Sequence, residues 1–462
     1  MIQRLDYRGD LTNLRQLADG LARSGLPGEA CWGKAERFAG AVAALAKTVE
    51  ESHGRRLRAL FVPGRIEVLG KHTDYAGGRS LIMAVEQGFS LVAVAREDRR
   101  VSVVDAARGE TIAFDLDAEL VPRVGHWSNY PMTVARRIAR NFPEASRGAE
   151  MAFSSDLPPA AGMSSSSAMM VAVFLALADV NELHESGPYR ENVHNLTDLA
   201  GYLGTVENGQ TFGSLEGDRG VGTFGGSEDH TAMLCSRANR MSQYAYCPVR
   251  FERAIAVPAG YTFAVATSGV AAEKTGAAME KYNAASRLAT AVAELWREET
   301  GRDDQHLAAA LDSGPEAAER LRSIVRSAES DSSQPGPLAK RLEHFLVESE
   351  EILPAAGDAL AQNDVSTFGR LVDRSQRAAE ELLGNQIPET SYLARSAREH
   401  GAAAASAFGA GFGGSVWALV EQSEAESFLA AWAESYGSKF PAIARTASFF
   451  TTTAGPAAFQ VC

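Results

Sequence analysis

Apolar residues recur at two spacings along the chain, and these spacings separate the expected helices from the expected strands. Apolar residues three and four apart predict amphipathic helices. These helices are expected at 36–50, 130–142, 277–299 and, with interruptions, 338–384. Short apolar runs between turn residues predict strands at 58–70, 80–85, 89–96 and 261–270, and a hairpin at 101–116 that turns near Arg108 and Gly109.

The character of the chain changes near residues 250–260, which predicts a domain boundary there. Strands alternate with glycine-rich loops before this point, whereas helical periodicity dominates after it. A chain of 462 residues is long enough for two or three domains of ordinary size. We therefore expect two domains, 1–255 and 256–462, and a polar surface excursion at 314–337.

Composition and charge disfavour several functional classes. The net charge of −13 leaves no excess of cations to neutralise phosphates, so we expect neither nucleic-acid binding nor a role at an anionic membrane. No apolar run reaches 18 residues and the first residues form no apolar signal segment, so we expect a cytoplasmic protein without membrane spans. The four cysteines form no CxxC pattern and are expected to be reduced thiols.

A serine-rich loop, "LPPAAGMSSSSA" at 157–168, stands between an expected strand and an apolar helix. The amino end of a helix presents unsatisfied N–H groups and partial positive charge, so this loop is a candidate anion site. Gly162 and the serines Ser164, Ser165, Ser166 and Ser167 are its candidate phosphate ligands, and one hydroxyl could hold a bridging metal. The alternative is a serine helix cap with spare serines.

A second motif, "PGRIEVLGKHTDYAGG" at 63–78, places Lys71, His72 and Asp74 within four residues after a strand that Pro63 and Gly64 interrupt. Charged groups near a core are costly unless they bind something, so this cluster is a candidate ligand site. A third motif, "GAGFGGS" at 409–415, has four glycines that allow positive φ and close backbone approach.

These three motifs, in this order, resemble the GHMP small-molecule kinase superfamily, and the resemblance covers nearly the whole chain. "HTDY" and "FGGSEDHTAMLC" at 224–235 are similar to galactokinases in particular. The resemblance implies a mixed α/β and α+β protein of two domains, the first like ribosomal protein S5 and the second ferredoxin-like. It also implies ATP on the serine loop, a sugar between the domains, and a monomer or weak homo-oligomer.

The family's reaction transfers the γ-phosphoryl group of MgATP to the anomeric hydroxyl of a sugar. By resemblance, Asp229 is the base and Arg65 pairs with it and with the phosphoryl group, while Ser166 is the candidate Mg²⁺ ligand. His72, Asp74 and, in "EKYN", Tyr282 match sugar contacts, as does the position of Lys71. The alternatives are a solvated loop acid for Asp229, a surface arginine for Arg65 and simple packing for Tyr282.

Lys71 and Glu67 depart from the family pattern, which has Glu and Asn at these positions. The family's Glu contacts the C6 hydroxyl of the sugar. Three interpretations stay open. The two changes compensate each other and leave galactose as substrate; or Lys71 binds a C6 carboxylate, which makes the protein a galacturonate or other uronate kinase; or Lys71 points to solvent or toward ATP.

Other departures bear on the metal and on activity. Ala160 replaces a glycine, His230 a glutamine, and Met170 stands where a magnesium-binding Glu is expected. Two alternatives follow for the ion: a loop serine with phosphates and waters, or Glu207 in "VENG". Because of Ala160 and Met170, a galactokinase-like sensor without turnover is a rival function. A GHMP kinase for mevalonate or homoserine is a second rival, which "HTDY" and the chain length disfavour.

Overall fold

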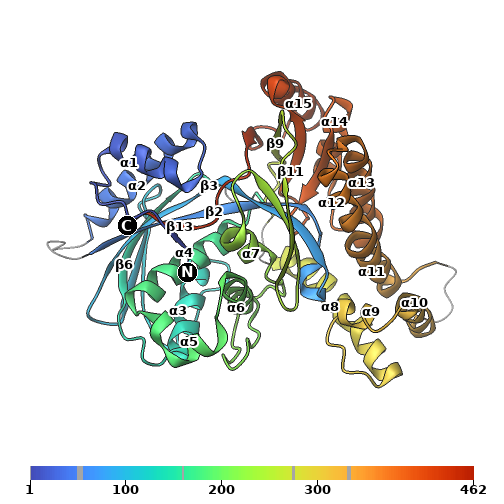
Figure 1. Ribbon diagram of the computed structural model, residues 1–462, viewed down its shortest axis with the longest axis horizontal. Coiled ribbons are helices and arrows are strands. Elements are labelled where there is room, and N and C mark those ends of the chain that lie inside the picture. The colour runs from blue at the N-terminus through green and yellow to red at the C-terminus, as the bar shows by residue number, and fades with distance from the viewer. Residues whose placement is uncertain (1, 49–55, 159–160, 273–275, 330–333) are drawn as a thin grey trace.

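The computed structural model describes residues 2–48, 56–158, 161–272, 276–329 and 334–462, in which two sheets are surrounded by helices (Figure 1). The departure noted at Ala160 lies outside the described residues. Figure 1 shows the larger sheet in the blue-to-green half of the ribbon, with the orange and red helices packed around the smaller sheet. The expected mixture of α/β and α+β structure is therefore present.

The larger sheet runs in the order β1-β13-β2-β3-β6-β4-β5, with β7 paired to β3 and β8 to β7. Its strands are β1 (Gln3–Arg4), β2 (Leu57–Leu69), β3 (Arg79–Ala95), β4 (Arg100–Asp105), β5 (Thr111–Asp115), β6 (Ala149–Ser155), β7 (Arg240–Ala245), β8 (Arg250–Ala256) and β13 (Phe459–Gln460). Pro63 does not interrupt β2. Instead, the register with β3 shifts between Pro63 and Arg65, because a bulge tolerates a residue that cannot donate a ladder hydrogen bond.

Helices cover both faces of this sheet, which explains why β2 is buried from end to end. On one face, Phe38 of α2 and Phe61 of β2 belong to one apolar cluster. The helices of that face are α1 (Leu14–Leu21) and α2 (Gly28–Leu45), and those gathered on the other side of the sheet in Figure 1 are α3 (Asn129–Asn141), α4 (Ser165–Val180), α5 (Gly187–Asn192), α6 (Leu196–Asn208) and α7 (Glu228–Cys235).

The smaller sheet is antiparallel, in the order β10-β11-β9-β12. Its strands are β9 (Tyr261–Thr267), β10 (Ala404–Phe408), β11 (Ser415–Glu421) and β12 (Ser448–Thr452). The buried Trp417 of β11 packs its ring against Phe263 and Phe368. The accompanying helices are α8 (Gly276–Thr300), α9 (Leu307–Leu311), α10 (Ala317–Ala328), α11 (Pro337–Phe345), α12 (Leu353–Ala361), α13 (Val365–Ala378), α14 (Pro388–Glu399) and α15 (Ala425–Lys439), with π-helical turns at Leu346–Ile352 and Ala379–Leu383.

The surface excursion expected at 314–337 is helical over half of its length. That region contains α10, which buries Leu321 and Val325 in a cluster with Trp296 of α8. The polar residues between them misled the prediction, because an amphipathic helix needs only one apolar face to pack.

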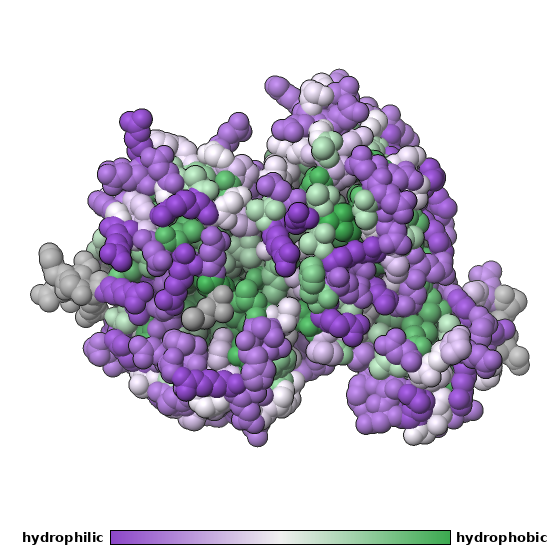
Figure 2. All heavy atoms as spheres, in the orientation of Figure 1, coloured by the Kyte–Doolittle hydropathy of each residue, from purple (hydrophilic) through white to green (hydrophobic). Residues whose placement is uncertain are grey.

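The division at residues 255 and 256 stays a prediction. β8 ends at Ala256 and β9 begins at Tyr261, so the change of sheet falls there. However, the C-terminal β13 pairs with β1 and β2 of the larger sheet. Figure 2 shows the two halves meeting along a recessed band that is rich in apolar residues, while hydrophilic residues cover the outer surface.

Candidate active site

Two adjoining cavities lie near the carboxyl end of β2 and share Arg65 and Ala410. The acidic cavity is lined by Arg65, Glu67, His72, Asp74, Tyr75, Glu207, Gly225, Gly226, Glu228, Asp229, His230, Tyr282, Gly409 and Ala410. The serine-loop cavity is lined by residues that include Phe89, His126, Trp127, Phe153, Gly162, Ser164, Ser165 and Ser166. Five of the residues predicted for the site, Arg65, His72, Asp74, Asp229 and Tyr282, therefore come together at the acidic cavity.

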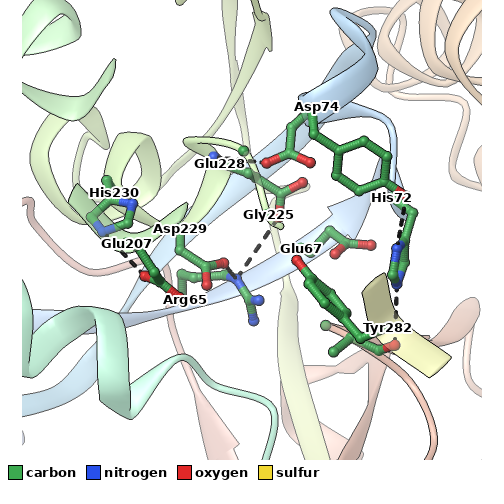
Figure 3. Close-up of a pocket in the computed structure, with 14 residues that line it drawn as sticks. Arg65, Glu67, His72, Asp74, Glu207, Gly225, Glu228, Asp229, His230 and Tyr282 are labelled. Carbon is green, nitrogen blue, oxygen red and sulfur yellow. Dashed lines mark hydrogen bonds and ion pairs between the residues drawn. The ribbon is translucent and has the colours of Figure 1, made fainter. Parts of the chain in front are cut away.

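Arg65 and Asp229 form an ion pair at the junction of the two cavities (Figure 3). Nε of Arg65 donates to Oδ1 of Asp229 over 2.7 Å, and the guanidinium also donates to the carbonyl of Gly162. Arg65 is only 3% exposed, which excludes the surface-arginine alternative. Burial lowers the pKa of Arg65, but Asp229, Glu228 and Glu67 raise it above its ordinary value, so the guanidinium stays charged.

The serine loop enters α4 through a tight turn. Gly162 has φ of +74° and Ser164 of +56°, so the chain reverses there and α4 begins at Ser165. The hydroxyl of Ser164 donates to Oδ2 of Asp229. Oγ of Ser167 lies 2.8 Å from Oε2 of Glu207 and 3.2 Å from Oδ2 of Asp229. The loop is thus tied to the acidic cavity while Ser165 and Ser166 face the serine-loop cavity.

Aromatic rings also line the serine-loop cavity, a feature that the residue-by-residue predictions missed. The ring of Trp127 lies 6.0 Å from that of Phe153, edge to face, and 5.9 Å from that of His126. Together with Phe89 they give this cavity an apolar wall in addition to the polar loop. The "HWSNYP" stretch carries Trp127, but nothing in its spacing distinguishes a binding tryptophan from a core one.

The wall opposite Arg65 in the acidic cavity is formed by His72, Asp74 and Tyr282. Nε2 of His72 lies 3.1 Å from the carbonyl of Ala410, so Nε2 donates and Nδ1 accepts from the hydroxyl of Tyr75 at 3.0 Å. The His72 ring also lies 5.0 Å from that of Tyr282. Burial raises the pKa of Tyr282 well above its ordinary value, so this phenol keeps its proton.

Lys71 is not among the residues that line the acidic cavity. It has no exposed surface, and its Nζ donates to Oγ of Ser375 on α13 over 3.2 Å. Ser375 in turn donates to Oε1 of Glu348, which also accepts from the backbone N–H of Gly70 at 2.8 Å. The interpretation that Lys71 points to solvent is therefore wrong, and the structure does not bring its ammonium to the sugar position predicted for it.

Glu67 and Glu228 add two carboxyl groups to the acidic cavity that were not predicted as site residues. Burial raises the pKa of Glu67 to about 7, although Lys71 and Arg65 oppose the rise. Burial, followed by Glu67 and Asp74, raises the pKa of Glu228 well above its ordinary value. Glu67 was seen in the sequence only as a departure from a pattern, because its direction depends on the register of β2.

Two positions bear on metal binding: Met170, where the family has a metal-binding Glu, and Glu207. Met170 has no exposed surface, lies in the apolar core and is not among the residues that line either cavity. Glu207 does reach the acidic cavity, beside Ser167 and 3.4 Å from Nε2 of His230. The described residues hold no cluster of three His, Cys, Asp or Glu that would bind a metal without help from a ligand.

Comparison with known proteins identifies the family. The model for the N-terminal domain of GHMP kinases matches residues 129–211, that for the C-terminal domain matches 358–438, and the galactokinase galactose-binding signature matches 50–96. The chain belongs to the GHMP kinase superfamily. Within it, the chain is galactokinase-like.

Curated relatives and a solved structure agree with this assignment. The galactokinase of Glaesserella parasuis serovar 5 is 29% identical over 82% of this chain and 89% of its own length. That of Roseiflexus sp. is 27% identical over 85% and 90%. The structure of Lactococcus lactis galactokinase complexed with galactose aligns with a TM-score of 0.72 at 23% identity, over 90% of this chain and 97% of that one, which confirms the predicted GHMP kinase fold.

Proposed function

We propose that the protein is a galactokinase, which transfers the γ-phosphoryl group of ATP to the anomeric hydroxyl of galactose. The observation that carries the proposal is the Arg65–Asp229 pair, which stands where the acidic cavity meets the serine-loop cavity. A phosphoryl group that passes between two cavities has to cross this point. In-line transfer depends mainly on positioning and on charge neutralisation, which such a junction supplies.

Each cavity suits one substrate. The aromatic residues of the serine-loop cavity suit a nucleotide base, and Gly162, Ser164, Ser165 and Ser166 in the same lining suit phosphates. In the acidic cavity, the carboxylate of Asp74, the neutral imidazole of His72 and the phenol of Tyr282 are suited to sugar hydroxyls, which both donate and accept hydrogen bonds.

Asp229 is the proposed general base. Its Oδ1 is held by Arg65 and its Oδ2 by serine hydroxyls, so the carboxylate has a fixed orientation toward the cavity. It accepts the proton of the anomeric hydroxyl as the oxygen attacks phosphorus. Arg65 lies beside the same point and balances the negative charge of the transferring group.

Mg²⁺ would be held by Glu207 together with a hydroxyl of the serine loop, Ser166 or Ser167. Hard oxygen donors, one carboxylate and bound phosphates are the set that this ion prefers, so the residues fit it. When bound, the ion neutralises phosphate charge. Met170 cannot bind this hard ion, so we place Glu207 in the role of the missing carboxylate.

A uronate kinase is the less favoured alternative. The acidic cavity has five carboxyl side chains, Glu67, Asp74, Glu207, Glu228 and Asp229, and Lys71 is not in its lining. A substrate carboxylate would add negative charge beside these groups, which is unfavourable at low dielectric. The interpretation that the changes at Glu67 and Lys71 compensate each other and leave galactose as the substrate therefore fits best. Glu67 then provides the carboxyl group in the cavity.

An ADP-release assay over a panel of hexoses and uronates tests the proposal. We expect turnover with galactose, and a loss of at least a hundredfold in kcat for Asp229→Asn, since a general base contributes about that much or more. Asp115→Asn, on the exposed side of β5, is the matched control and should leave kcat unchanged. Absence of sugar-dependent ADP release with every sugar would refute the kinase function.

The cellular location and the assembly state are part of the proposal as well. Among the helices that the structure describes, none is long and apolar enough to cross a membrane. A cytoplasmic protein, present as a monomer or weak homo-oligomer, remains our prediction.

A further inference from the structure

Glu67 is the carboxyl group of the acidic cavity that the proposed mechanism does not use. It lies on β2 two residues after Arg65, so both side chains leave the same face of the strand. The residue is 4% exposed, and within the described part of the chain its Oε1 has no hydrogen-bond partner. Figure 3 shows it in the middle of the cavity, between Asp229 on one side and His72 and Tyr282 on the other.

The neighbouring cations are engaged elsewhere. Arg65 pairs with Asp229 at 2.7 Å and lies 3.8 Å from Glu228. Nζ of Lys71 contacts Ser375, and no ion pair within 4 Å joins Glu67 to any cation among the described residues. A buried carboxyl group without a partner is costly, so its retention favours a ligand that supplies a hydrogen-bond donor or a positive charge.

The surroundings of Glu67 strengthen this preference. The lining of the acidic cavity contains four further carboxyl groups and a single guanidinium. Glu228 and Asp229 lie within 4 Å of that guanidinium, and Glu207 is next to the serine loop, where Mg²⁺ would be held. Glu67 is thus a carboxyl group of this lining that no described cation approaches within 4 Å.

We propose that Glu67 contacts the sugar directly and makes the cavity select sugars by charge. A hexosamine, which brings an ammonium group, is phosphorylated at least as efficiently as the neutral hexose, and a uronic acid is excluded. The inference rests on the proposed function, since it requires that this cavity holds the sugar. An ammonium group beside Glu67 forms a charge-assisted hydrogen bond, which is stronger than one from a neutral hydroxyl.

The test compares kcat/KM for galactosamine, galactose and galacturonate at pH 7, in the unmodified protein and in Glu67→Gln. We expect the unmodified protein to use galactosamine at least as well as galactose, and galacturonate at least a hundredfold less well. In Glu67→Gln the ratio of kcat/KM for galactosamine to kcat/KM for galactose should fall at least tenfold, which corresponds to about 1.4 kcal/mol. Because both sugars are assayed on one preparation, the ratio does not depend on the fraction of folded protein.

Glu150→Gln is the matched control, because Glu150 is a buried glutamate of β6 paired with Arg96 and away from both cavities. It should leave the ratio unchanged. A change of less than twofold in Glu67→Gln, or galacturonate used within tenfold of galactose by the unmodified protein, would overturn the inference while leaving the galactokinase function in place. Calorimetric binding of galactosamine and galactose to Asp229→Asn gives a second readout without turnover, and equal affinities there would also overturn it.

Discussion

Arg65 and Asp229 are 164 residues apart in the chain and meet because the second half of β2 and the first turn of α7 both border the acidic cavity. Each lies in a local motif, and their pairing was expected only by resemblance, whereas the structure gives the contact itself. The same is true of Glu67, whose identity was visible in the sequence and whose direction was not. At the scale of residues, the sequence therefore predicts which chemistry is available, while the fold decides which groups share a cavity.

Glu67 should make the stability of the protein depend on pH. Its pKa is raised from about 4.5 to about 7, so the folded state holds this proton more tightly than the unfolded state. The stabilisation is complete below pH 4.5 and is lost as pH rises through 7. Glu67→Gln should therefore raise the free energy of unfolding by about 3 kcal/mol at pH 8 and by much less at pH 5.

Urea unfolding at the two pH values measures this difference. Glu150→Gln again provides the comparison, since Glu150 is paired with Arg96 and its replacement should bring no gain at pH 8. An equal effect of Glu67→Gln at pH 5 and pH 8 would contradict the argument.

At the scale of elements, Lys71 joins the end of β2 to α13 and to the π-helical turn that contains Glu348. The end of β2, α13 and the π-helical turn thus meet through a buried polar network. Its members come from segments that are hundreds of residues apart, so the motif around Lys71 could not reveal its partners. Lys71 was predicted to contact the sugar because its position in the motif matches a sugar contact of the family.

Lys71→Met should lower stability without changing sugar selectivity. Removal of the ammonium leaves the hydroxyl of Ser375 with one partner fewer in a buried site, at a cost of about 1–3 kcal/mol. Thermal unfolding measures the loss, and the ratio of galactose to galacturonate turnover should stay within twofold. Lys47→Met, at an exposed position, is the control. A tenfold shift toward galactose would show that Lys71 faces the sugar after all.

Gly226, in the loop before α7, has to be glycine because the carboxyl group of Asp74 lies close to its backbone. A Cβ at this position would lie 2.4 Å from Oδ2 of Asp74, which also accepts the backbone N–H of Glu228 at 3.2 Å. Gly226→Ala should displace Asp74 and raise KM for galactose about tenfold, with a smaller effect on KM for ATP. Gly40→Ala, in the middle of α2 with open space around it, should change neither constant. Steady-state kinetics with each substrate varied would decide, and equal effects on both KM values would contradict a local role.

At the scale of the whole molecule, the chain returns to its starting sheet. β13 pairs with β1 and β2, and the ring of Phe459 lies 5.1 Å from that of Phe61. The last residues therefore complete the core beneath β2, the strand that carries Arg65 and Glu67. This closure was not predicted, because a two-residue strand leaves no periodic signal.

Phe459→Ala should destabilise the larger sheet by about 3–5 kcal/mol, as expected for a fully buried phenylalanine. The melting temperature measures the loss. Phe251→Ala, at a side chain that is 41% exposed, should have a much smaller effect. If the two variants melted alike, β13 would not be part of the cooperative core.

The sequence by itself determined the superfamily, the GHMP kinase fold, most helices and strands, and five of the residues that line the acidic cavity. Short motifs suffice for these because periodicity and loop chemistry are local properties. Only the tertiary structure decided that Lys71 is buried against α13, that Glu207 rather than the position of Met170 reaches the cavity, and that Glu67 faces it. Side-chain direction and charge balance depend on contacts between distant segments, and these contacts exist only once the chain has folded.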